Sequence, residues 1–98
     1  MKFSELMSKS SESFSEFTGR DFIVTGLAYD SRKIEPGNVF FAIKGLKDDG
    51  SKYIKDAISK GASAVIIESS ADKLNDEREV TTARIRKAMA SMSKVLHG

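Results

Sequence analysis

Two apolar runs separated by an amphipathic stretch constrain the fold of this chain more than any other feature. Residues 39–44 read VFFAIK and residues 64–68 begin AVII, with no alternation of polar and apolar side chains. Continuous apolar runs are typical of strands that are buried on both faces of a parallel sheet. Between them, residues 52–60 place apolar side chains on one helical face and lysines on the other. The whole span of about 30 residues has the length of one strand–helix–strand unit.

The segments on either side of this unit predict further strands and helices. Residues 21–30 are rich in β-branched and aromatic side chains and predict one strand or two short ones, bent at Gly26. Residues 80–83 predict a last short strand, and apolar side chains at helical spacing predict helices over 2–9 and from Ile85 onward. The predicted fold class is therefore α/β, with a small, mostly parallel or mixed sheet flanked by helices.

The connections between these elements carry their own signatures. Pro36 presets its backbone angle and Gly37 accepts positive φ, so residues 35–38 predict a type II turn. Gly61 is expected to end the preceding helix. Residues 8–15 are serine-rich and show no periodicity, which predicts a loosely held loop.

Length and composition are those of one globular domain, residues 1–98, with 40% hydrophobic and 31% charged side chains. The chain has no cysteine, which excludes disulfides, thiolate metal sites and cysteine nucleophiles. It has no apolar run of membrane-spanning length, so we expect no membrane partner and a cytoplasmic location. The net charge is +2, and acidic residues interrupt the basic ones throughout. Without a basic stripe, nucleic acid is not an expected partner.

Polar residues follow two neighbouring predicted strands. Asp30-Ser31-Arg32 end the first, and Leu46-Lys47-Asp48 lie in a glycine-bounded loop after the second. In a functional interpretation, the Ser31 hydroxyl and backbone donate to a phosphate or ribose, and Arg32 adds a fork of charged donors. In the alternative, Asp30 bonds backbone N–H groups of a simple turn and Arg32 is a surface charge. On residue type alone, we expect Tyr29 in the core.

Other candidate sites fail on order or spacing. Residues 45–52 read GLKDDGSK, which inverts the lysine and serine of a phosphate-binding loop and adds two aspartates where the phosphates would lie. His97, the single histidine, lies in the last turn of the closing helix, where a cation suits the helix dipole. A set of acidic residues lacks metal-loop spacing and predicts a solvated patch: Asp72, Asp76, Glu77 and Glu79. We therefore expect no catalytic and no metal-ligating residue in this chain.

Several spaced motifs in this order resemble the N-terminal domain of the Mur ligases. The family pattern is a DSR, a P-G turn, an apolar F-x-A-x-x-G strand, a D-G, and a helix that ends in G-A before an apolar strand. The residues that fall on it are Asp30, Ser31, Arg32, Pro36, Gly37, Phe40, Ala42, Gly45, Asp49, Gly50, Ala57, Gly61 and Ala62. The closing ARIRKAMASMSKVLHG resembles the family's R-x-A-L-A helix, so the resemblance covers residues 27–98. It is closest to the MurE type.

The resemblance implies the first of three domains of a cytoplasmic, ATP-dependent ligase of peptidoglycan precursor synthesis. This domain would hold the UDP part of UDP-N-acetylmuramoyl-L-alanyl-D-glutamate for addition of diaminopimelate or lysine. The central domain would use ATP and Mg²⁺ to activate the dipeptide carboxylate, and the C-terminal domain would present the amino acid. Carried over by position, Ser31 is the main UDP contact, with Tyr29 and Arg32 beside it and Leu46, Lys47 and Asp48 as a second loop.

The chain also departs from the family pattern. Ser51 follows the D-G, where the family usually has histidine. The family's G-T-N-G-K-T ATP loop does not occur in these 98 residues, so we expect a domain of a longer ligase that catalyses nothing alone. Two alternatives stay open. One is the same domain of a MurF-type ligase, which adds D-Ala-D-Ala and shares the DSR, P-G and D-G motifs. The other is a non-catalytic α/β interaction or regulatory module.

Overall fold

The computed structural model describes residues 1–43, 50–68 and 73–98. In this part of the chain, four strands form one sheet whose spatial order follows the sequence. They are β1 (Gly26–Ala28), β2 (Asn38–Ala42), β3 (Ala64–Ile67) and β4 (Glu79–Thr81). All three pairings are parallel. The prediction of an α/β fold with a mostly parallel sheet is confirmed.

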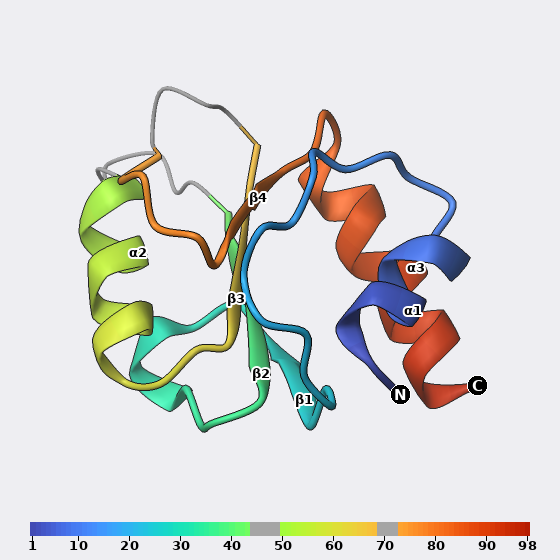
Figure 1. Ribbon diagram of the computed structural model, residues 1–98, viewed down its shortest axis with the longest axis horizontal. Coiled ribbons are helices and arrows are strands. Elements are labelled where there is room, and N and C mark those ends of the chain that lie inside the picture. Colours follow the sequence, from blue (N-terminus) through green and yellow to red (C-terminus); the bar gives the residue numbers. More distant parts are fainter. Residues whose placement is uncertain (44–49, 69–72) are drawn as a thin grey trace.

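Helices cover both faces of the sheet. Their bounds are α1 (Phe3–Lys9), the three-residue 3-10 helix η1 (Ser31–Lys33), α2 (Gly50–Ser59) and α3 (Ile85–His97). Figure 1 shows α2 and the 31–33 segment on one face, and α1 and α3 on the other, with both termini on the side of α1 and α3. The strand–helix–strand unit predicted for residues 39–68 is therefore β2–α2–β3.

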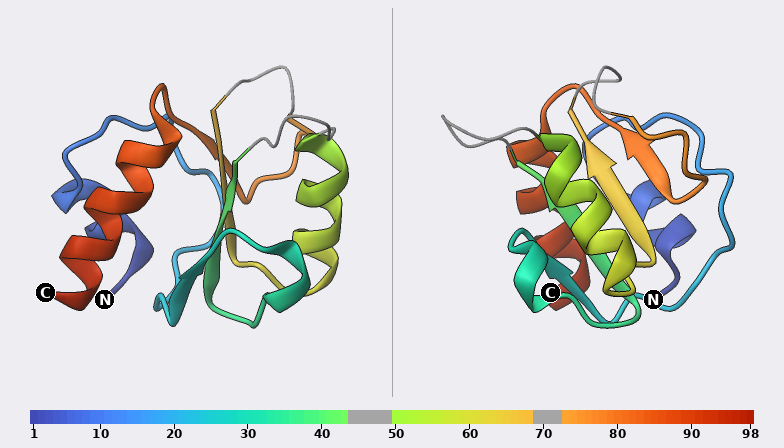
Figure 2. Two further views of the ribbon diagram at one scale, coloured as in Figure 1. Left: turned by 180° about the vertical axis from the view of Figure 1, so that it is seen from behind. Right: turned by 90° about the vertical axis from the view of Figure 1, so that its left-hand side faces the viewer.

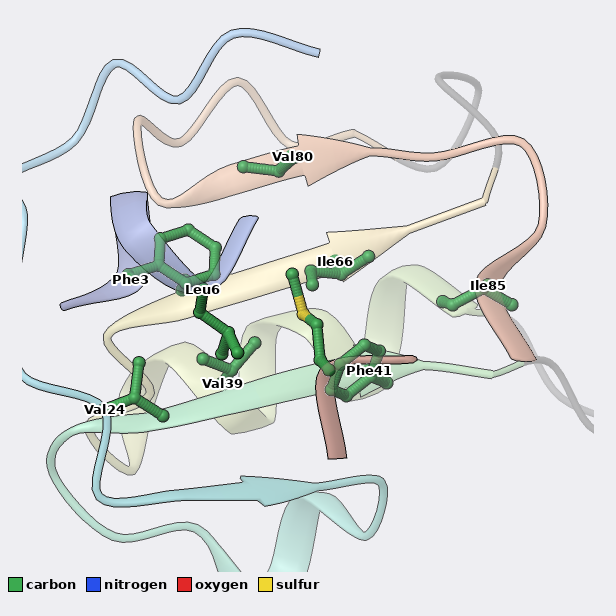
Figure 3. Packing of buried hydrophobic residues seen from close by; sticks show 10 residues of the cluster. Phe3, Leu6, Val24, Val39, Phe41, Ile66, Val80 and Ile85 are labelled. Atoms are coloured by element: carbon green, nitrogen blue, oxygen red, sulfur yellow. The ribbon is translucent and has the colours of Figure 1, made fainter. Parts of the chain in front are cut away.

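The continuous apolar strands are explained by burial on both faces. Val39 and Phe41 of β2 pack in the cluster beneath α1 and α3, while Phe40 and Ala42 pack in the cluster beneath α2. Figure 3 shows the first cluster, in which Phe3 and other side chains meet those of the strands. Since alternate side chains of one strand enter two different cores, neither face of the sheet tolerates a polar side chain at these positions.

Turn residues set the amino ends of the central strands. Gly37 has φ of +86°, and the Asn38 N–H donates to the Glu35 carbonyl at 3.0 Å, as the predicted type II turn requires. Gly61, at φ of +102°, ends α2 as predicted.

The serine-rich segment continues α1 to Lys9 and is then a loop, which hydrogen bonds attach firmly to β4 and Thr82. The Ser15 N–H donates to the Thr81 carbonyl and the Thr82 hydroxyl donates to the Ser13 carbonyl, both at 2.9 Å. These bonds cover the outer edge of β4, which would otherwise present unpaired backbone groups. The sequence did not predict this pairing, because a serine-rich segment has no hydrophobic pattern that fixes which of its residues lie opposite β4.

Candidate functional site

The candidate site begins where β1 ends beside β2. The register pairs Ala28 with Phe40 as the last residues of β1 and β2 in contact, and β2 then continues to Ala42. The carboxyl ends of β1 and β2 are therefore adjacent, but β2 extends two residues beyond the end of β1. In open α/β sheets, ligands bind outside the carboxyl ends of the strands. From the end of β1 the chain turns at Tyr29 and Asp30 into η1.

Asp30 fixes that turn through three hydrogen bonds from Arg32. Its Oδ1 accepts from the Arg32 backbone N–H and from Nε, and its Oδ2 accepts from Nη2, each at 3.0 Å. We call this arrangement a D-x-R clamp. The bonds from Arg32 lower the pKa of the Asp30 carboxyl to about 2, so the carboxylate is charged at neutral pH. The same bonds raise the pKa of the Arg32 guanidinium.

Ser31 lies between the two residues of the clamp and is largely covered. The residue is 5% exposed. Figure 2 shows η1 lying alongside α2 on the same face of the sheet, and a smaller part of the raised Arg32 pKa comes from Tyr53 of α2. Contact between Ser31 and a ligand would therefore be confined to a small part of this residue.

Tyr29 is the clearest departure from the residue-based expectation. Its side chain is not in the core, because the residue is 71% exposed. The reason is the position of β1, a three-residue strand at the edge of the sheet, where no further strand of the described residues lies beside it. Tyr29 therefore offers an accessible aromatic face next to the 30–32 turn.

The second predicted loop cannot be compared with the structure. Leu46, Lys47 and Asp48 lie outside the described residues, as does the inverted phosphate-loop sequence around them. Of the six predicted contact residues, the structure thus brings Tyr29, Ser31 and Arg32 together in one turn. Ile43 is the last described residue on the β2 side.

Glu79 contradicts the prediction of a solvated acidic patch. It is 3% exposed, and its carboxylate accepts hydrogen bonds from the backbone N–H groups of Leu74 and Asp76 at 2.7–3.0 Å. Asn75 between them has φ of +62°, the left-handed conformation that asparagine tolerates better than most residues. The N–H groups on the two sides of such a left-handed residue can form a concave cradle for an anion. Here the anion is the chain's own carboxylate, so the role is structural.

A second D-x-R clamp follows in the same loop. Asp76 Oδ1 accepts from the Arg78 backbone N–H at 2.9 Å and from Nε at 2.8 Å, and Oδ2 accepts from Nη2 at 2.8 Å. These bonds lower the pKa of Asp76. Arg78 also lines a hollow of about 270 Å³ together with Arg20 and Ser63. That hollow lies at the amino ends of β3 and β4, the opposite end of the strands from the candidate site.

In residues 1–43, 50–68 and 73–98, no group of three or more histidine, aspartate or glutamate side chains is placed to hold a metal ion. None of the helices described there is long and apolar enough to cross a membrane.

Comparison with known sequences finds one family and a consistent set of relatives. A sequence model described as Mur ligase family, catalytic domain, matches residues 17–97. A UDP-N-acetylmuramoyl-L-alanyl-D-glutamate–2,6-diaminopimelate ligase of Solibacter usitatus is 44% identical over 75 residues, which are 76% of this chain and 15% of that protein. The ligase of the same name from Clostridioides difficile is 58% identical over 45 residues, 46% of this chain and 9% of that protein.

Comparison with solved structures finds the same fold in larger proteins. The MurF ligase from Thermotoga maritima in complex with ADP matches with a TM-score of 0.61 and 26% identity, over 81% of this chain and 17% of that one. A MurF from Acinetobacter baumannii matches with a TM-score of 0.66 over 90% of this chain and 19% of that one. At 20% identity, the second similarity shows the fold alone. In every case the chain spans less than a fifth of its relative.

Proposed function

This chain belongs to the Mur ligase family, and on that premise we propose that it is the UDP-binding N-terminal domain of a MurE-type ligase. The family match over residues 17–97 covers most of the chain. The relatives named above are diaminopimelate ligases that act on UDP-N-acetylmuramoyl-L-alanyl-D-glutamate, according to their names. The proposed substrate is therefore that UDP-linked dipeptide.

In the proposed reaction the longer protein forms an amide bond between the D-glutamate and a third amino acid, diaminopimelate or lysine. ATP with Mg²⁺ would supply the energy by activating the carboxylate, in a central domain outside this chain. A C-terminal domain of the same protein would present the amino acid. This chain would contribute binding and orientation of the UDP end. Because the reaction consumes ATP, the proposed compartment is the cytoplasm.

One observation supports the binding role more than any other: an exposed aromatic ring and the Ser31 turn lie together at the carboxyl end of β1. Tyr29 is 71% exposed, although most large apolar side chains of the described residues are covered. A ring in this position can stack on a nucleobase, a contact worth roughly 1–3 kcal/mol in single-stranded nucleic acid complexes. Ser31 would bind the phosphate or ribose through its hydroxyl or backbone. Residues 46–48 would form the second loop, by resemblance to the family.

Titration of the purified chain with UDP, followed by backbone amide NMR, tests this proposal. We expect the shifts to concentrate at residues 29–32 and 46–48. Ser31→Ala should weaken the response, whereas Ser93→Ala on α3, on the opposite face of the sheet, should not. Weak affinity is expected, since most of the substrate would contact other domains. Shifts that concentrate elsewhere, or their absence at millimolar UDP, would count against a UDP site here.

A MurF-type ligase is the second candidate, because the MurF ligase from Thermotoga maritima matches at 26% identity. The stronger sequence similarity, 44% against 26% identity, favours the MurE type. The product of the full-length protein separates the two: addition of diaminopimelate or lysine supports MurE, and addition of D-Ala-D-Ala supports MurF. If the chain binds no UDP, the result would favour the other alternative, a non-catalytic α/β interaction or regulatory module.

A further inference from the structure

We propose that Asp30 and Arg32 are positioning residues of the UDP site, which lock the turn that carries Ser31 without contacting the ligand themselves. This inference rests on the proposed function, and it changes the expected role of Arg32. The family resemblance suggests Arg32 as a UDP contact, whereas the geometry directs its guanidinium toward Asp30.

The bonds of the clamp enclose Ser31. Asp30 accepts three hydrogen bonds from Arg32, and the Lys33 N–H donates to the Asp30 carbonyl at 3.1 Å, which closes the turn from the other side. To bind a phosphate with the same fork, Arg32 would have to give up two charge-assisted bonds to a carboxylate. The arrangement therefore holds the backbone on both sides of Ser31 in one conformation.

The charge of Asp30 argues in the same direction. Its carboxylate is ionised at neutral pH, since its pKa is lowered to about 2. A phosphate that approached the paired guanidinium would also approach this negative charge, and like charges at close range repel. The pair as a whole is neutral, so it offers a phosphate little net attraction.

A second clamp with the same bonds fixes a different turn of this chain. Asp76 and Arg78 repeat all three bonds of Asp30 and Arg32, atom for atom. They do so in the loop before β4, away from the candidate site. A D-x-R spacing at the start of a turn thus has a local structural cause in this chain: the carboxylate caps a backbone N–H and the arginine pairs with the carboxylate.

The two possible roles of Arg32 predict opposite effects for the loss of Asp30. If Arg32 contacts the UDP phosphates, Asp30→Ala frees the guanidinium and removes a negative charge, so UDP should bind more tightly. If the clamp positions Ser31, Asp30→Ala loosens the turn, and the apparent affinity falls with the fraction of molecules that still form it. The sign of the change in affinity therefore separates a contact from a positioning role.

The experiment measures UDP affinity by amide NMR for the wild-type chain, Asp30→Ala, Arg32→Gln and the double variant. We expect all three variants to bind UDP about two- to fivefold more weakly, as suits an exposed ion pair. The double variant should lose no more than either single one, because both break the same clamp. Hydrogen exchange at the Arg32 amide without ligand should accelerate in the two single variants, and thermal unfolding confirms that the chain remains folded.

Matched controls separate the turn from general charge and stability. Glu35→Gln removes an exposed negative charge close to the turn without touching the clamp, and should leave UDP affinity equal or slightly higher. Arg78→Gln breaks the other clamp and should leave UDP affinity unchanged. Equal or tighter binding by Asp30→Ala, or a double variant whose loss is the product of the single losses, would overturn the positioning role. A wild-type chain that binds no UDP would instead refute the proposed function, and the positioning role with it.

Discussion

The buried carboxylate of Glu79 allows a sharp prediction about stability. Its Oε1 accepts from the N–H groups of both Leu74 and Asp76, at 3.0 and 2.7 Å, and its Oε2 accepts from Leu74 at 2.8 Å. In Glu79→Gln, one oxygen is replaced by an NH₂ group. With the amide nitrogen at the Oε2 position, two donors would face each other across the 2.8 Å contact; with it at the Oε1 position, the Asp76 N–H would lose its acceptor.

Either orientation leaves one buried donor without an acceptor and weakens a charge-assisted bond. An unsatisfied buried donor costs about 1–3 kcal/mol, and hydrogen bonds to a charged group contribute about 1.5–3 kcal/mol. Relief of the burial of a charge offsets part of this loss, so we expect a net destabilisation of about 2 kcal/mol. For a domain of this size, that corresponds to a fall of about 8–16 °C in the unfolding temperature.

Urea unfolding at neutral pH, followed by circular dichroism, measures the change in the free energy of unfolding. Glu77→Gln is the matched control, because Glu77 is exposed and lies in the same loop; its effect should stay within about 0.5 kcal/mol. A Glu79→Gln variant as stable as this control would show that the 74–76 turn does not depend on the carboxylate.

Three further predictions follow from the same structure. Gly37→Ala should destabilise the chain by more than about 1–2 kcal/mol in urea unfolding, since φ is +86° and the new Cβ would lie 2.7 Å from a neighbouring hydroxyl oxygen. The pKa of Asp30 is lowered, so its pairing with Arg32 should persist below the ordinary carboxyl pKa and be lost only as pH falls through about 2; carboxyl carbon NMR that shows titration near pH 4 would contradict this. Phe41→Ala should cost about 3–5 kcal/mol, while Tyr29→Ala should change stability by less than about 0.5 kcal/mol, because the first side chain is fully buried and the second is exposed.

The sequence correctly predicted the elements whose hydrophobic pattern is compatible with only one kind of secondary structure and burial. A run such as VFFAIK can be satisfied only where both faces of a strand are covered, and β2 is indeed buried along its whole length. The amphipathic pattern of residues 52–60 likewise places Ile54 and Ala57 on the face of α2 that is buried against the sheet. The turn at Pro36 and Gly37 followed from backbone angles that few other residues adopt.

The failures concern properties that depend on distant parts of the chain. Tyr29 was expected in the core because aromatic residues usually are, but its exposure follows from the edge position of β1, which local sequence does not encode. Glu79 was assigned to an acidic patch because charge alone was considered, whereas its burial depends on the N–H groups of the 74–76 turn. Within the site, the DSR motif predicted the position of the turn correctly, but only the hydrogen bonds show that Asp30 already engages Arg32.

The N-terminal helix has a consequence for where this folding unit starts. The family match begins at residue 17, yet Phe3 and Leu6 are fully buried in the cluster that α3 completes. A polypeptide trimmed to the matched segment would expose to solvent the apolar side chains of α3 that α1 covers. It would also lose the hydrogen bonds of Ser13 and Ser15 at β4 and Thr82. The segment that matches the family is therefore shorter than the segment that folds as one unit. The first sixteen residues lie outside the match, but they are part of the folded core.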